Sequence, residues 1–168
     1  ENVVISPADG KIVFIGDSKA PPELNLKDTF IKLSIFLDVF NVHVNRIPIS
    51  GKILDIKYVH GKFFRANVDK ASKDNERNII LIENKEGEKI IVSQIAGLIA
   101  RRIVCDLKIN QEVIKGNKFG IIKFGSRVDI YLPNNYLPMV LNGQIVIGGE
   151  SIIANPLNIQ KLESSINI

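Results

Sequence analysis

Apolar and polar residues alternate over short runs along almost the whole chain. These runs are rich in Ile and Val, and Gly, Pro, Asn or Asp separates one run from the next. A period of two predicts β-strands with one face toward a core. The predicted strands cover residues 11–16, 30–37, 42–47, 52–59, 78–83, 89–97, 101–107, 119–124, 128–132 and 144–154.

Three stretches lack this pattern. Residues 19–25 contain adjacent prolines, which cannot sit inside a sheet, so we expect a loop there. Residues 84–89 have the composition of a hairpin turn. Residues 67–77 are polar, and we predict a loop or one helical turn there. The pattern therefore predicts a mainly β fold: one domain over residues 1–168, a β-barrel or sandwich with few short helices.

Composition narrows the class of protein. The chain has 168 residues and a net charge of +4, with its Lys and Arg scattered among the acidic residues. A nucleic-acid-binding protein would show a clustered basic face, so we expect no nucleic-acid partner. Weak attraction to anionic lipid surfaces is compatible with this net charge. No run of 18 apolar residues occurs. The single cysteine, Cys105, excludes an intrachain disulfide and a cysteine-based zinc site, and we expect it to be a small buried core residue.

Four residues are candidates for chemistry, and each has an ordinary explanation when taken alone. Asp9 lies in the turn-like string "SPADG", and His43 is flanked by valines on a predicted strand, where it could be a surface residue. Ser126 follows Gly125 between two strand-forming runs, as a serine at a bulge would. The second histidine, His60, precedes a glycine and reads as a turn residue.

Taken together, Asp9, His43 and Ser126 supply a carboxylate, a base and a hydroxyl nucleophile. Histidine is the usual base for a serine because its pKa lies near ~6.5, and a carboxylate can fix the imidazole tautomer. The chain has no G-x-S-x-G string and no alternating helices, so an α/β-hydrolase is excluded. An intramolecular reaction is attractive instead, because the carbonyl before Ser126 belongs to the unhindered Gly125.

Several long strings resemble a known family. "ISPADGKIV", "FLDVFNVHVNRIPISGKI", "ANVDKASKDNERN", "QIAGLIARRIVC", "FGIIKFGSRVDIYLP" and "GQIVIGGESIIA" are similar to the short, single-domain branch of phosphatidylserine decarboxylase. The resemblance runs from residue 5 to about residue 154. It implies a fold like the barrel-sandwich hybrids.

The resemblance implies a pyruvoyl enzyme that forms by self-cleavage, with no metal and no pyridoxal phosphate. Ser126 would attack the Gly125 carbonyl to give an ester, and β-elimination followed by hydrolysis would leave a pyruvoyl group and release ammonia. Residues 1–125 would become the β chain and residues 126–168 the α chain. The family pattern places Asp9 and His43 in proton transfer.

The same resemblance implies the reaction. The pyruvoyl ketone would form a Schiff base with the amine of phosphatidylserine and accept the electrons that CO2 leaves behind, giving phosphatidylethanolamine. His43 is the first candidate for the acid that protonates the resulting carbanion. Arg46 stands where the longer branch has a second histidine. It either grips the lipid phosphodiester or is a solvated charge at a strand end.

A lipid substrate implies contact with the cytoplasmic membrane. Phe63, Phe64 and the segment 131–140 could dip into the interface, although core packing explains them as well. The chain starts with Glu rather than Met, so we expect a fragment whose membrane anchor lies upstream. The expected partners are phosphatidylserine, the membrane surface and the two cleaved chains; the sequence leaves a homodimer open.

Two other functions remain open. A non-enzymatic β-barrel carrier or binding module would keep its chain intact and give the Gly125–Ser126 bond no role. A pyruvoyl decarboxylase of a soluble amino acid would cleave in the same way but act without lipid. Only the resemblance speaks against these two readings.

Overall fold

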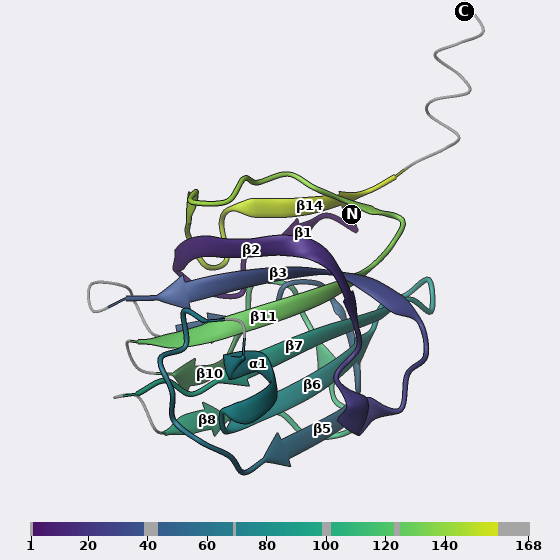
Figure 1. The fold of residues 1–168 in the computed structure, drawn as a ribbon. Helices are drawn as coiled ribbons and strands as arrows, with labels where there is room; N and C mark the ends of the chain where they lie inside the picture. The colour runs from purple at the N-terminus through teal and green to yellow at the C-terminus, as the bar shows by residue number, and fades with distance from the viewer. Residues whose placement is uncertain (1, 39–43, 69, 99–101, 123–124, 158–168) are drawn as a thin grey trace, which may run out of the picture.

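The computed structural model describes residues 2–38, 44–68, 70–98, 102–122 and 125–157, and strands dominate them (Figure 1). Eight of the strands form one strongly curled sheet in the order β13-β2-β3-β11-β7-β6-β5-β9, with every neighbouring pair antiparallel. Its strands are β2 (Gly10–Lys19), β3 (Thr29–Leu37), β5 (Gly51–Val59), β6 (Arg77–Glu83), β7 (Lys89–Ile95), β9 (Glu112–Val113), β11 (Ser126–Pro133) and β13 (Ile145–Val146). The prediction of a mainly β barrel or sandwich is confirmed.

Two three-stranded sheets close the open sides of this half-barrel. One has the order β1-β14-β12 and the other β4-β10-β8. Their strands are β1 (Val4–Ile5), β4 (Val44–Arg46), β8 (Ile103–Cys105), β10 (Lys118–Ile122), β12 (Tyr136–Pro138) and β14 (Ile152–Pro156). In Figure 1, β1 and β14 lie above β2, and β8 and β10 lie behind the large sheet.

The two faces of the large sheet carry separate hydrophobic clusters. Along β11, Val128, Ile130 and Leu132 point into the main core, whereas Tyr131 points to the opposite, outer face. This follows from the two-residue period of a strand. Ser126 lies on the inner face by the same alternation, and Arg127 and Asp129 lie on the outer one. The strand is buried on both sides because α1 (Ala71–Asp74) and its flanking loops cover the outer face (Figure 1).

The local predictions from turn composition are confirmed. Residues 84–88 join β6 to β7 as a hairpin, in which Asn84 Oδ1 accepts hydrogen bonds from the backbone N–H groups of Glu86 and Glu88. The polar stretch 67–77 contains the single turn of helix α1. The diproline stretch forms a loop with one short 3-10 turn, η1 (Pro22–Leu24).

Two expectations, and the alternative interpretation of Ser126 as a bulge residue, were wrong. Residues 144–154 are not one strand, because a turn at Gly148 and Gly149 separates β13 from β14. Ser126 is not at a bulge: it begins β11 and pairs with β3 in unbroken register. Cys105 is half-buried at the margin of the main core rather than enclosed by it, although burial still raises its pKa.

Among the described residues, no helix has the length and apolar character needed to span a bilayer.

Candidate functional site

The Gly125–Ser126 peptide lies at the start of β11. Gly125 has a φ of +77°, a left-handed conformation that glycine adopts without strain. Its N–H donates to the Leu37 carbonyl oxygen at 2.6 Å, and Ser126 pairs with Leu37 at the end of β3. Ser126 is completely buried. The peptide is therefore held at a fixed position on the inner face of the sheet.

Gly97 packs directly against this peptide. A Cβ atom at position 97 would overlap the Gly125 carbonyl oxygen and would lie 2.7 Å from the carbonyl carbon. The same atom would lie 3.3 Å from the backbone nitrogen of Ser126. Real side chains do not approach backbone so closely, so only glycine fits at position 97 while the Gly125–Ser126 peptide keeps this place.

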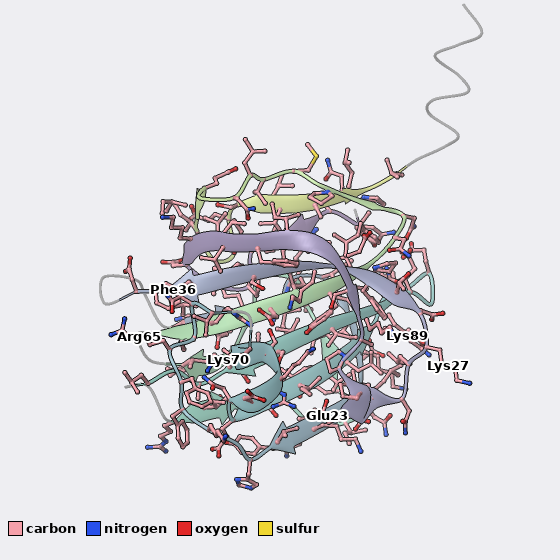
Figure 2. All side chains as sticks on the ribbon, in the orientation of Figure 1. Glu23, Lys27, Phe36, Arg65, Lys70 and Lys89 are labelled. Carbon is pink, nitrogen blue, oxygen red and sulfur yellow. The ribbon has the colours of Figure 1, made fainter. Side chains whose placement is uncertain are left out.

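A cavity of about 300 Å³ opens beside Gly125. It lies at the end of the large sheet where β3 ends and β11 begins, and Figure 2 shows the labelled side chains of Phe36 and Arg65 at that end. Its lining combines apolar surface with one exposed cation, Arg65. The lining residues are Phe36, Arg65, Ala66, Asn67, Leu98 and Gly125.

A buried ion pair holds the loop that lines this cavity. Arg127 Nε lies 2.9 Å from Asp129 Oδ1, and both side chains are almost completely buried. Although the angle at Nε falls outside hydrogen-bond geometry, the opposite charges compensate each other. Arg127 Nη1 also donates to the carbonyl oxygens of Ala66 at 3.0 Å and Val68 at 2.8 Å. Arg127, directly after Ser126, thus holds in place the loop that lines the cavity.

Ser72 of α1 joins the same network. Its hydroxyl donates to Asp129 Oδ2 at 2.7 Å and also contacts Arg127 Nη2. The helical turn is therefore tied to β11 through the same two charged residues.

Asp9 lies in the turn before β2, where Asp9 Oδ1 accepts a hydrogen bond from the backbone N–H of Gly148 at 2.6 Å. In the register of β2 on β3, Lys11 pairs with Phe36, so Asp9 lies level with the end of β3. Ser126 pairs with that end from the other side. Asp9 and Ser126 therefore flank β3 with backbones about 10 Å apart, two strand spacings.

Arg46 connects the Asp9 turn with the turn after β13. Its backbone N–H donates to the Pro7 carbonyl oxygen at 2.8 Å, and its Nη1 donates to the Gly116 carbonyl oxygen at 2.8 Å. A Cβ atom at Gly149 would lie 2.6 Å from Arg46 Cδ. The interpretation of Arg46 as a solvated strand-end charge is wrong, because the side chain is half-buried and packed against backbone.

His43 lies outside the described residues. Its described neighbour Val44 pairs with Ile121 of β10. Asn45, on the strand face that alternation predicts for His43, is completely buried, and its Oδ1 accepts a hydrogen bond from Gln94 Nε2 at 2.9 Å. Gln94 lies on the inner face one diagonal step from Ser126. The inner face near Ser126 is therefore polar.

His60 follows β5 in an irregular segment rather than in the expected turn. Its side chain is 86% exposed, and its Nδ1 lies 3.4 Å from Glu76 Oε1. A hydrogen bond from Tyr58 lowers the pKa of Glu76, and burial together with that bond raises the pKa of Tyr58 to about 12. Because β6 and β7 lie between β5 and β11, His60 is separated from the Gly125–Ser126 bond, and its exposed imidazole agrees with the structural interpretation of His60.

Four residues at the site escaped sequence reasoning. Gly97 and Arg65 give no local signal, because their importance arises only from contact with Gly125. Arg127 and Asp129 stand two apart on a strand, and this spacing could have indicated a same-face ion pair.

Comparison with known proteins identifies the family. A family model described as phosphatidylserine decarboxylase matches residues 1–154. The phosphatidylserine decarboxylase proenzymes of Rickettsia typhi and Rickettsia prowazekii are each 57% identical over 156 residues. That of Rickettsia africae is 58% identical over the same length. Each alignment covers 92% of this chain and 68% of the relative.

The family model and these relatives define the chain as an enzyme of the decarboxylase class. The chain belongs to the phosphatidylserine decarboxylase family. The resemblance seen in its sequence is confirmed.

Proposed function

We propose that this chain cleaves its own Gly125–Ser126 bond, converts Ser126 to a pyruvoyl group and then decarboxylates phosphatidylserine to phosphatidylethanolamine. The observation that carries the proposal is the left-handed Gly125 packed on Gly97 directly before the buried Ser126. An ordinary strand start needs neither feature. The proenzyme names of the relatives support a maturation step.

The cleavage uses groups that the chain itself supplies. The Ser126 hydroxyl attacks the Gly125 carbonyl carbon, the C–N bond breaks, and the acyl group moves to oxygen as an ester. Removal of the Ser126 α-proton then expels the Gly125 carboxylate, and water releases the former Ser126 nitrogen as ammonia. Gly97 supports the first step because it leaves the Gly125 carbonyl free of side-chain obstruction on that side.

Proton transfer during the cleavage is assigned to His43, and Asp9 is its orienting carboxylate. The separation of about 10 Å between the backbones of Asp9 and Ser126 is too long for a direct hydrogen bond between their side chains. An imidazole between a carboxylate and a serine hydroxyl has the reach to connect them. The proposal gives that position to His43, with Asp9 fixing its tautomer.

The surroundings of Ser126 fit a pyruvoyl group. The inner face there is polar, with Gln94 and Asn45 hydrogen-bonded to each other, and Gly125, on the other side of the bond, lines the cavity at the end of the sheet. Once formed, the pyruvoyl carbonyl supplies the electron sink for decarboxylation. The 300 Å³ cavity has room for a serine headgroup, and Arg65 at its margin can attract the headgroup phosphate.

Arg46 is the second candidate for the phosphodiester. Its contacts with Gly116 and Gly149 fix the guanidinium, which suits a bidentate grip. Arg46→Ala should then raise KM for phosphatidylserine with little change in kcat. Unchanged kinetics in Arg46→Ala, with a raised KM in Arg65→Ala, would transfer the role to Arg65.

We assign the protein to the cytoplasmic membrane surface. Large apolar side chains stand exposed around β12, β13 and β14, within and beside the segment 131–140 that the sequence suggested. They are Leu137, Met139, Leu141, Ile145, Ile147 and Ile152. Phe63 and Phe64 are half-buried, and the Phe64 ring instead lies under the ammonium groups of Lys62 and Lys70. Leu137→Ser with Met139→Ser should weaken sedimentation with phospholipid vesicles. Unchanged sedimentation would show that this surface does not bind the membrane.

The direct test of the activity is CO2 release from carboxyl-labelled phosphatidylserine in detergent micelles. Ser126→Ala should reduce release to background, because the group that makes the electron sink is gone. Ser34→Ala is the matched control, since Ser34 is also a buried strand serine and its hydroxyl has no hydrogen-bond partner among the described residues. Turnover in Ser126→Ala would refute the proposal, and equal turnover of free serine would favour a soluble substrate.

A further inference from the structure

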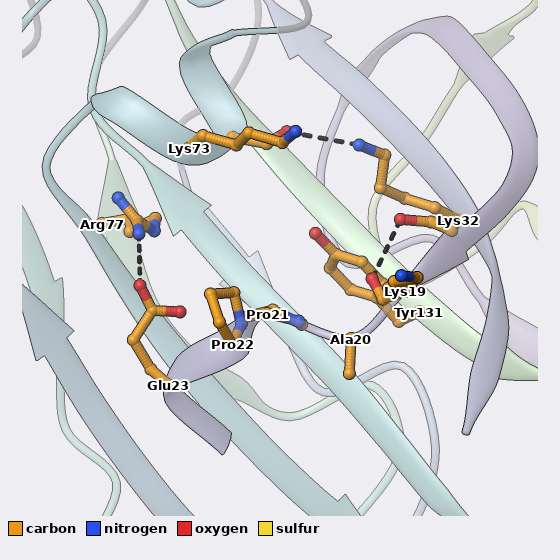
Figure 3. Close-up of a pocket in the computed structure, with 11 residues that line it drawn as sticks. Lys19, Ala20, Pro21, Pro22, Glu23, Lys32, Lys73, Arg77 and Tyr131 are labelled. Carbon is orange, nitrogen blue, oxygen red and sulfur yellow. Dashed lines mark hydrogen bonds and ion pairs between the residues drawn. The ribbon is translucent and has the colours of Figure 1, made fainter. Parts of the chain in front are cut away.

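A second pocket, which we call the lysine pocket, lies on the outer face of the large sheet (Figure 3). Its volume is about 640 Å³, and it is bounded by the η1 loop, β3, β6, β11 and α1. Tyr131 forms part of its wall, five residues beyond Ser126 on β11 and on the opposite face. The pocket is thus about 16 Å along the strand from the Gly125–Ser126 bond and separated from it by the sheet.

The lining of the lysine pocket is strongly cationic. Lys19, Lys32, Lys73 and Arg77 contribute four positive charges, and Glu23 is the only acidic residue among its lining residues. Glu23 Oε1 is taken by Arg77 Nη2 at 2.5 Å. No carboxylate of the described residues lies within ion-pair distance of the three lysines. Three ammonium charges are therefore left for a ligand.

Lys32 is held in place by neutral groups. Its Nζ donates to Ser72 Oγ at 3.3 Å and lies 5.0 Å above the centre of the Phe14 ring and 5.9 Å from that of Tyr131. Asp129 lies beneath Ser72, but its charge is compensated by Arg127. Figure 3 shows Lys32 and Lys73 pointing toward one another. An anion between two such ammonium groups is attracted to both.

The Arg77–Glu23 pair supplies a second indication of a ligand. Arg77 is 6% exposed, yet its Nε has no hydrogen-bond acceptor among the described residues. Glu23 Oε2 is likewise buried without a donor. Buried polar atoms are usually hydrogen-bonded, so Arg77 Nε and Glu23 Oε2 are left for a ligand that offers an acceptor and a donor once these side chains turn toward the pocket.

We propose that the lysine pocket binds a phosphate ester, with its phosphate between Lys32, Lys73 and Lys19 and its esterified part toward Arg77 and Glu23. A phosphate carries up to two negative charges and enough oxygens for three ammonium donors. The volume exceeds what a lone carboxylate fills and suits a small esterified group. The ligand is either a soluble phosphate ester or the headgroup of an anionic lipid. The proposal does not depend on cleavage at Ser126.

The test for the soluble form follows backbone amide signals of the 168-residue chain by NMR while glycerol phosphate is added at constant ionic strength. The amides of Ser72, Lys73 and Tyr131 should shift with saturation. Lys32→Gln with Lys73→Gln should weaken binding at least tenfold, whereas Lys32→Arg with Lys73→Arg should restore it. The control variant Lys52→Gln with Lys108→Gln removes the same charge from exposed positions outside the pocket lining and should bind like wild type.

The lipid form is tested by sedimentation with vesicles of phosphatidylglycerol in phosphatidylcholine. Loss of sedimentation in the Lys32→Gln, Lys73→Gln variant but not in its control, with no saturable effect of glycerol phosphate, would assign the pocket to a lipid headgroup. Saturable shifts without vesicle dependence would assign it to a soluble ester. Absence of both effects, or equal losses in the pocket variant and the control, would overturn the proposal.

Discussion

The α-carbon of Gly97 packs against the carbonyl group of Gly125, so closely that a methyl group at position 97 would occupy the place of the Gly125 oxygen. The two glycines come from different parts of the chain, one just after β7 and one just before β11. Their contact fixes the carbonyl that the Ser126 hydroxyl is proposed to attack. The proposed cleavage therefore depends on Gly97, a residue without a side chain.

Gly97→Ala should therefore block maturation while the domain still folds. The added methyl must displace the Gly125–Ser126 peptide, and a shift of about 1 Å in a reacting group can cost on the order of a hundredfold in rate. Cleavage is followed by gel electrophoresis over time. Gly16→Ala is the control, because its methyl meets only the Phe14 ring, at 3.0 Å. Cleavage of Gly97→Ala at the wild-type rate would show that the contact is incidental.

Asp9→Asn and His43→Ala should each leave an uncleaved chain, because the proposed base and its orienting carboxylate act on the Ser126 proton. Asp9→Asn keeps an oxygen that can accept the hydrogen bond from the Gly148 N–H, so its fold should be retained. If His43→Ala is cleaved but releases no CO2 from phosphatidylserine, the role of His43 is confined to turnover. Normal cleavage and turnover in both variants would remove the pair from the mechanism.

Arg127→Gln should lower the free energy of unfolding by about 3–5 kcal/mol, the usual cost of leaving one partner of a buried ion pair alone. Asp129 would lose its compensating charge, and the carbonyls of Ala66 and Val68 would lose a donor. Urea unfolding measures the change. Lys57→Gln is the surface control: Lys57 Nζ lies 3.8 Å from Asp55 Oδ2 at an exposed site, where about 0–1 kcal/mol is expected. Equal costs in the two variants would contradict the buried role.

Glu88 should make stability depend on pH. Burial opposes ionisation of Glu88, but hydrogen bonds from Asn84, Asn135 and Tyr136 outweigh it and lower the pKa of its carboxyl group. A lowered folded-state pKa gives stability that is present above the unfolded pKa of about 4.3 and is lost as pH falls below it.

Glu88→Gln should consequently cost about 1 kcal/mol at neutral pH, a value reduced by partial exposure, and almost nothing near pH 3. Thermal unfolding across this range measures the difference between variant and wild type. Glu86→Gln, an exposed residue of the same hairpin, should show no such trend. A stability difference between Glu88→Gln and wild type that persists at acidic pH would rule out the ionised carboxylate as its source.

Sequence patterns anticipate the features that depend on near neighbours. The hairpin at residues 84–88 and the helical turn α1 follow from local turn chemistry and polarity. The split of residues 144–154 was missed because the Ile-rich runs on both sides concealed the turn at Gly148 and Gly149. β12 was missed because it is three residues long and ends in proline.

At the candidate site, too, local sequence patterns do not predict contacts between distant parts of the chain. The resemblance of the strings around them singled out Ser126 and Asp9, since residue type alone does not distinguish them among 18 acidic residues and ten serines. Their positions on either side of β3 depend on strand register, which no local pattern fixes. The bond from Arg127 to Ala66 spans 61 positions and appears only once the sheet has formed.

The central claim is that the chain matures by cleavage at Gly125–Ser126, and an intact mass spectrum of the denatured protein tests it most directly. The account predicts two fragments, residues 1–125 and 126–168, with the second lighter by one ammonia than simple hydrolysis would leave it. A single mass for the unbroken chain, in a preparation that decarboxylates phosphatidylserine, would contradict it.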